Sequence, residues 1–121
     1  MSIAGIIQLI DNQPINYSLD QDDLTISDTI DILIDWQQLY CKSIVPKLME
    51  LYRERLSYLS SIKIIIELIT KMTDSINEYI ALIRSDQSNL LVTSILIRDK
   101  VVTTNKSIRQ QLFNINHSES C

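Results

Sequence analysis

Apolar residues recur at helical spacing along most of the chain. Between Leu48 and Ile83 they step alternately by four and three residues, in a stretch without glycine or proline. This heptad spacing predicts one long helix, about 55 Å at 1.5 Å per residue, that buries a continuous stripe. The stripe has eleven positions, of which nine are apolar and two, Arg55 and Thr73, are polar. The positions are Leu48, Tyr52, Arg55, Leu59, Ile62, Ile66, Ile69, Thr73, Ile76, Ile80 and Ile83.

A second apolar row widens the face that this helix would bury. The row contains Leu51, Tyr58, Ile65, Met72 and Tyr79. Three apolar positions per heptad are typical of a three- or four-helix bundle rather than a two-stranded coiled coil. Ile64 and Leu68 fall outside both rows. Around residues 62–69 we therefore expect a helix that is buried from several sides.

An earlier helix is predicted to begin near Thr25 or Ser27. Thr25 and Asp28 fit a capping box in which Asp replaces the usual Glu. Pro46 predicts a break before the long helix, because the residue preceding a proline disfavours helical angles. The alternative is a nearly continuous rod kinked at Pro46, since residues 41–45 contain no Gly, Asn or Asp to form a turn.

Residues 1–24 are expected to form an arm followed by a loop. Ile3, Ile6, Ile7 and Ile10 have the spacing of a short amphipathic helix, which Gly5 weakens and Pro14 ends. Two interpretations stay open for this arm. It either folds back onto the bundle or docks on a partner.

A third helix is predicted after the polar break at residues 85–89. Apolar residues return at helical spacing from Leu90, and the competing prediction is a strand over residues 90–97. Residues 114–121 are polar and are expected to form a flexible, frayed tail.

The scarcity of turn-forming residues supports few, long helices. The chain of 121 residues has one glycine and two prolines, where average usage predicts roughly 14 together. We therefore expect an all-α fold, an elongated three-helix bundle or coiled coil with one long central helix and a short N-terminal arm. The predicted organisation is an arm and loop at 1–24, a bundle at 25–113 and a tail at 114–121.

Charge is distributed unevenly along the chain. Residues 1–40 hold seven Asp and no Lys, Arg or Glu, within a net charge of −4. We expect this acidic region to pair with a basic surface, in this chain or in a partner. Such a distribution is not the footprint of a nucleic-acid-binding protein.

The residues needed for common catalytic and metal sites are missing. His117 is the single histidine and Gly5 the single glycine, which excludes histidine-based catalysis in a rigid site and a glycine-rich phosphate loop. His117 and Cys121 are too few for a structural metal site, which needs four ligands. We therefore expect neither enzymatic activity nor a cofactor or metal.

No targeting segment is recognisable in the sequence. Residues 3–10 are apolar but lack a preceding basic region, and no apolar run approaches the ~18–20 residues of a membrane span. Cys41 and Cys121 are too few for a disulfide framework. We expect a soluble intracellular protein, cytoplasmic or nuclear, without a membrane span.

Two polar residues interrupt the long stripe. Arg55 is expected either to extend its guanidinium to solvent or to pair with an acidic residue, because an unpaired buried charge is costly. Thr73 is expected to mark a thinner layer of the core or to set the register of packing.

The long stripe exceeds what the rest of the chain can cover. We therefore expect a helical subunit or adaptor that assembles with partner helices, more often of another protein than of a second copy. The alternative is a self-contained bundle that binds an amphipathic helix or a small apolar ligand in a groove. The predicted partner interface contains Trp36, Tyr40, Arg55, Ile62, Ile64, Ile65, Ile66, Leu68, Ile69 and Met72.

Overall fold

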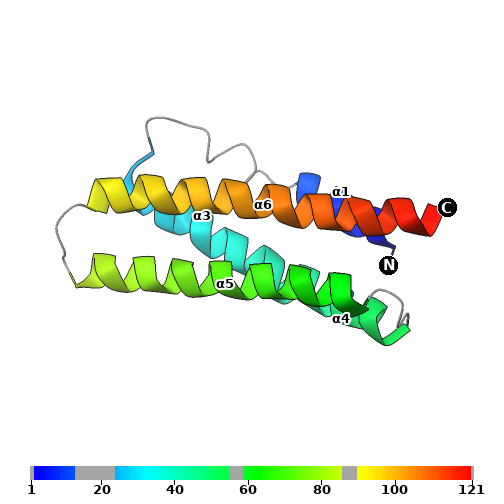
Figure 1. Cartoon of the computed structure of the whole chain (residues 1–121). Coiled ribbons are helices and arrows are strands. Elements are labelled where there is room, and N and C mark those ends of the chain that lie inside the picture. Colours follow the sequence, from blue (N-terminus) through cyan, green and yellow to red (C-terminus); the bar gives the residue numbers. More distant parts are fainter. Residues whose placement is uncertain (1, 13–23, 55–58, 86–89, 121) are drawn as a thin grey trace.

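The described part of the chain is helical, and none of it forms a strand. The computed structural model describes residues 2–12, 24–54, 59–85 and 90–120 (Figure 1). The helices are α1 (Ile3–Asp11), α3 (Ile26–Leu39), α4 (Val45–Glu54), α5 (Leu59–Arg84) and α6 (Leu90–Ser120), with a π-helical turn, η1 (Tyr40–Ile44), between α3 and α4. The prediction of an all-α fold is therefore confirmed.

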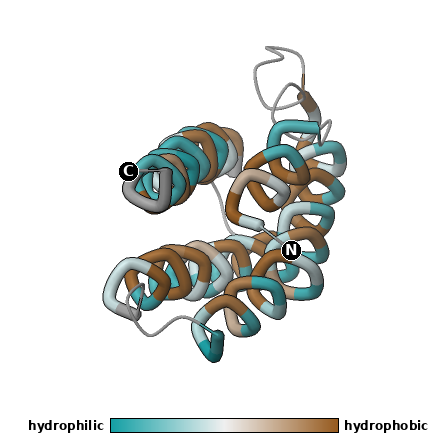
Figure 2. Tube along the Cα trace, turned by 90° about the vertical axis from the view of Figure 1, so that its right-hand side faces the viewer, coloured by the Kyte–Doolittle hydropathy of each residue, from teal (hydrophilic) through white to brown (hydrophobic). Residues whose placement is uncertain are grey.

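The helices lie lengthwise beside one another. α3, η1 and α4 follow each other as one rod, α5 returns along that rod, and α6 runs antiparallel to α5 (Figure 1). α1 lies against the C-terminal half of α6 and runs in the opposite direction (Figure 1). Seen from one end, the rod, α5, α6 and α1 surround a common centre (Figure 2). The bundle thus has a fourth helical segment, which the three-helix prediction treated as an arm.

The prediction of one long helix from Leu48 to Ile83 is wrong. α4 ends at Glu54, α5 begins at Leu59, and the two helices lie side by side (Figure 1). The heptad pattern identified the buried faces of both helices, because each one packs its stripe against the same core. Such a pattern says which side of a helix is buried, but it does not say whether the chain reverses direction.

Pro46 does not end a helix. The rod continues through it, as the alternative prediction proposed, and η1 comes directly before the proline. The backbone N–H of Val45 donates to the carbonyl of Tyr40, five residues back instead of four. A proline inside a regular α-helix clashes with the carbonyl four residues earlier, and a widened π turn relieves such crowding.

The predicted start of α3 is confirmed. Thr25 Oγ1 accepts from the backbone N–H of Asp28 at 3.0 Å, and Asp28 Oδ2 accepts from the backbone N–H of Thr25 at 3.2 Å. This reciprocal capping box satisfies two backbone donors that the first turn leaves without helical partners.

α6 begins where the third helix was predicted and ends later than expected. Residues 90–97 are helical, so the competing strand is wrong, and the helix continues to Ser120, seven residues beyond residue 113, where the bundle was expected to end. The N-terminal arm does contain a helix, α1, whose Ile3, Ile6 and Ile10 are buried. The arm therefore folds back onto the bundle.

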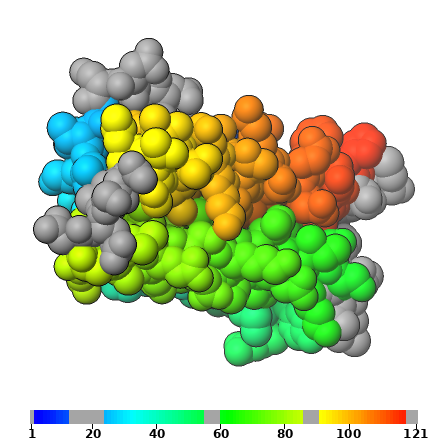
Figure 3. All heavy atoms as spheres, turned by 60° about the vertical axis from the view of Figure 1, so that its left-hand side comes forward, coloured from blue at the N-terminus to red at the C-terminus, as the bar shows by residue number. Residues whose placement is uncertain are grey.

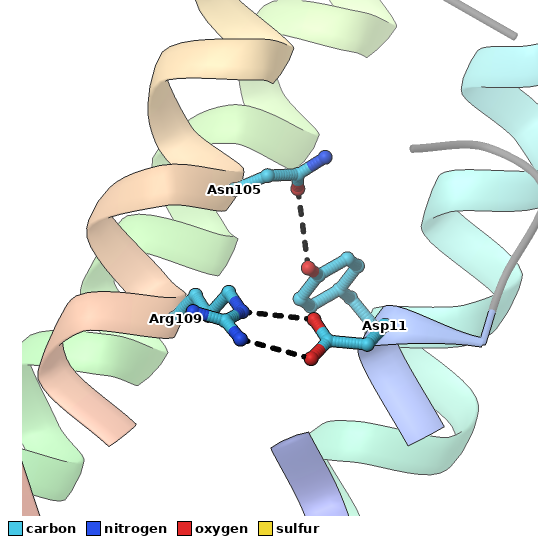
Figure 4. A network of polar contacts seen from close by, with 4 residues as sticks. Asp11, Asn105 and Arg109 are labelled. Atoms are coloured by element: carbon cyan, nitrogen blue, oxygen red, sulfur yellow. Dashed lines mark hydrogen bonds and ion pairs between the residues drawn. The ribbon is translucent and has the colours of Figure 1, made fainter. Parts of the chain in front are cut away.

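A half-buried amide holds the rod against α6. Asn105 Oδ1 accepts from Trp36 Nε1 at 2.7 Å and from the Tyr40 hydroxyl at 3.1 Å. Figure 4 shows Asn105 with one of these two hydrogen bonds, on the same helix as Arg109. The Trp36 and Tyr40 rings stack with their centroids 4.3 Å apart, and neither residue is exposed. One oxygen on α6 thus satisfies both aromatic donors of the rod, which aligns the two elements.

We predict that Asn105→Ala destabilises the fold by about 2–4 kcal/mol, because two buried donors lose their acceptor at about 1–3 kcal/mol each. Chemical denaturation measures this change. Asn77→Ala is the matched control, since the exposed Asn77 side chain accepts a hydrogen bond at the protein surface, from Gln37 Nε2 at 3.0 Å. A loss for Asn105→Ala no larger than for Asn77→Ala would contradict the role given to this amide.

Stability is predicted to fall at alkaline pH through Tyr40. Burial, and next the nearby charge of Asp11, raise the pKa of the Tyr40 hydroxyl above its ordinary value of 10.0. The folded state therefore favours the protonated phenol, so this stabilisation is complete below pH 10 and is lost as the pH rises above it. We expect Tyr40→Phe to weaken the alkaline loss of unfolding free energy, measured by denaturation between pH 8 and about 11. Equal alkaline slopes for both proteins would refute this.

Candidate protein-interaction surface

Most of the residues predicted to form a partner interface lie inside the chain's own core. Six of them are at most 2% exposed: Trp36, Tyr40, Ile62, Ile65, Ile69 and Met72. Ile66 and Leu68 are half-buried against that core, and Arg55 lies outside the described residues. Ile64 is 46% exposed, so the middle of α5 is not covered on all sides as expected. In the folded chain the six buried side chains leave no surface for a partner.

Large exposed apolar side chains gather instead where α6 begins and α5 ends. On α6 these are Leu91, Val92, Ile95 and Leu96, exposed by 64%, 56%, 45% and 62%. Leu82 near the end of α5 is 41% exposed and shares a hollow with Leu96. We call these five residues the α5–α6 patch. Figure 3 shows the first turns of α6, in yellow, at the surface beside the last turns of α5.

The patch lies on the side of α6 that faces away from the core. The buried residues of α6 form the opposite stripe: Ser94, Ile97, Val101, Ile108, Leu112 and Ile115. The helix is thus apolar on both sides in its first two turns, a pattern normally found in helices that are covered on both sides. The sequence carries this signal as two apolar runs, at 90–92 and 95–97, which also fit the competing prediction of a strand.

A hollow of ≈190 Å³ opens beside the patch, between α5 and α6. Its lining consists of Ser75, Glu78, Tyr79, Leu82, Thr93, Leu96, Ile97 and Lys100. Among the lining residues, Tyr79 is hydrogen-bonded through its hydroxyl to the buried Ser94 Oγ, and Lys100 Nζ donates to Ser75 Oγ at 2.6 Å. Since an apolar cavity of about 150 Å³ holds a benzene-sized group, this hollow can receive a Leu or Phe side chain.

A second hollow, of ≈730 Å³, lies between α3 and α5. Its lining includes Asn77, Arg84 and Ser85, and Ile34 is the large apolar side chain exposed there, at 40%. The α5–α6 patch gathers five large exposed apolar side chains where this hollow has one, so the patch is the stronger candidate for protein binding.

An ion pair ties α1 to α6. Arg109 donates from Nε and Nη2 to the two carboxylate oxygens of Asp11, at 2.9 and 3.1 Å (Figure 4). Both side chains remain partly exposed, Arg109 by 54% and Asp11 by 39%, and the hydrogen bond to Asp11 raises the pKa of the Arg109 guanidinium. The acidic N-terminal region thus meets a basic residue of its own chain, one of the two pairings expected.

The described residues contain no cluster of three or more side chains able to hold a metal ion. Nor does any described helix combine the length and the apolar character that crossing a membrane requires. Cys41 is exposed, and its Sγ lies 3.5 Å from Oγ1 of the half-buried Thr73, whereas Cys121 lies outside the described residues.

Because the patch is exposed and Ile97 is buried, we predict that polar substitutions at these neighbouring positions of α6 differ in their effect on stability. Leu91→Gln and Leu96→Gln should each change the free energy of unfolding by less than about 1 kcal/mol, because both side chains are already in water. Ile97→Gln, at a position that is 6% exposed, should cost about 3 kcal/mol or more by burying an amide. Chemical denaturation of the three variants measures these differences. A large loss of unfolding free energy for Leu91→Gln would mean that this side chain is buried within the chain.

Comparison with protein-family models, with curated proteins and with solved structures finds no match for this chain.

Proposed function

We propose that this protein is a non-enzymatic helical subunit or adaptor, and that a helix of another protein docks on its α5–α6 patch. The observation that carries the proposal is the exposure of Leu91, Val92, Ile95 and Leu96 on the outer side of α6, beside Leu82. Five large apolar side chains in one place on a small protein are typical of a protein-binding site.

The neighbours of α6 leave the patch uncovered. α6 has 31 residues and α1 has nine, which correspond to about 46 Å and about 13 Å. α1 lies beside the C-terminal half of α6 (Figure 1). Farther toward its start, α6 is contacted by α3, and the rod is bonded to Asn105. Neither neighbour covers the outer side of the first turns, where a partner helix would bury the patch.

The surroundings of the patch indicate the chemistry of the partner. The hollow between α5 and α6 accepts one large apolar anchor, and Glu78 and Lys100 border it with charges of both signs. An amphipathic helix with a Leu or Phe at its centre and polar residues at its margins fits this arrangement. Interfaces commonly combine such an apolar anchor with a polar rim that excludes water.

We expect the double substitution Leu91→Asp/Leu96→Asp to remove the partner. A carboxylate forced into an apolar interface without a counter-charge loses several kcal/mol, which corresponds to more than a tenfold loss of affinity. The measurement is the amount of each protein that co-purifies with the tagged chain from its native source, followed by identification and titration of the protein that disappears.

The matched control is Thr103→Asp/Gln110→Asp, which adds the same two charges at exposed positions of the same helix. The proposal predicts that this control retains the partner. Equal binding by the patch variant and the control would overturn it. If light scattering shows that the wild-type chain forms a dimer and that the patch variant does not, the surface binds a second copy of this chain instead.

A further inference from the structure

Exposed carboxylates border the α5–α6 patch on both of its helices. Glu78 lies one turn before Leu82 on α5 and also lines the hollow between the two helices. Asp99 follows Leu96 by three residues, so it continues the exposed side of α6. Asp74 lies one turn before Glu78. In the part of the chain that the structure describes, none of these three carboxylates has an ion pair or a hydrogen bond.

The cations near the patch are bonded to the chain itself or face another side. Lys100 Nζ donates to Ser75 Oγ at 2.6 Å, and Arg98 Nε donates to the backbone carbonyl of Ser94 at 3.3 Å. Arg84 lines the hollow between α3 and α5, not the one beside the patch. The charges left for a docked helix to pair with are therefore the negative ones.

The next cations along the two helices lie beyond the patch. Lys71 precedes Leu82 by 11 residues on α5, and Lys106 follows Leu96 by 10 residues on α6. These separations correspond to about 16 Å and about 15 Å along the helices. Since exposed charges more than about 10 Å apart are largely screened at 0.1 M salt, neither lysine offsets the carboxylates at the patch.

A helix seated over the hollow would reach both of the nearest carboxylates. An α-helix with its side chains is about 10 Å wide, and packed helices have axes about 8–10 Å apart. Its apolar anchor would enter the hollow beside Leu96, and its two edges would lie over α5 and α6. Cationic side chains on these edges would pair with Glu78 and Asp99, whereas carboxylates there would be repelled.

We propose that the helix that docks on the α5–α6 patch is a basic amphipathic helix. It carries a Leu or Phe that fills the hollow, and Lys or Arg residues on both edges that pair with Glu78 and Asp99. Complementary charges at the margin of an interface select among partners of similar apolar surface and speed their association. This inference rests on the proposed function, because it specifies the partner of the same site.

The test uses two fluorescent peptides and the full chain. Both peptides have about 18 residues, or five helical turns, and the same apolar face with a central Leu. One carries Lys at the margins of this face and the other carries Glu. Measured by fluorescence anisotropy at about 0.1 M salt, the Lys peptide should bind about 3–10-fold more tightly than the Glu peptide. At about 1 M salt the difference should largely disappear, because exposed charges are screened.

Glu78→Lys/Asp99→Lys should abolish or reverse this preference, because the margin of the patch then becomes positive. The matched control is Glu50→Lys/Glu54→Lys, which changes the net charge equally. These two exposed carboxylates belong to α4, which lies beside the start of α5, at the other end of that helix from the patch (Figure 1). The control should keep the preference for the Lys peptide.

The outcomes separate this inference from the proposed function. Equal affinity of the wild-type chain for both peptides would overturn the inference, and so would an equal loss of preference in both charge variants. Leu91→Gln/Leu96→Gln removes apolar surface without adding charge and should weaken both peptides more than tenfold. If that loss occurs although the wild-type chain does not distinguish the peptides, the proposed function holds and the basic partner is refuted. Absence of saturable binding of either peptide would overturn both.

Discussion

The fold depends on how the rod is held against α6, and one side chain does most of this. Asn105 presents a single oxygen to the indole of Trp36 and the hydroxyl of Tyr40, two groups that belong to different turns of the rod. Apolar contacts between helices tolerate sliding, whereas two buried donors with one shared acceptor do not, because a shift would leave both unsatisfied. The remaining isoleucine and leucine layers stabilise an alignment that this amide specifies.

A second constraint is geometric. Three long segments form most of the bundle, and the fourth position is filled by a helix of nine residues beside one of 31. α3 and then α1 lie in turn beside α6, and neither covers the outer side of its first turns, although α6 has there the composition of a segment covered on both sides. The core is therefore complete where α1 lies and open on the outer side where α6 begins.

The sequence predicted the helical content, the capping box at Thr25 and the buried faces, since each depends on local spacing or local hydrogen bonds. It did not reveal the reversal between α4 and α5, because a heptad pattern keeps its phase whether one helix continues or two helices share a core. Asn105 looked like an ordinary polar residue, since its partners are more than 60 positions away. The patch was missed for a related reason: an apolar residue in the sequence does not say whether another part of the chain reaches it.

The contact between α1 and α6 and the packing of the core are not independent of each other. Arg109 follows Asn105 by one helical turn, so the ion pair to α1 lies next to the amide that aligns the rod, and Asp11 is close enough to Tyr40 to raise the pKa of its hydroxyl (Figure 4). α1 therefore limits the access of water to the hydrogen bonds that Asn105 accepts, in addition to burying its own three isoleucines. A helix of nine residues in this way supports the alignment of the longer segments, although it is too short to be stable by itself.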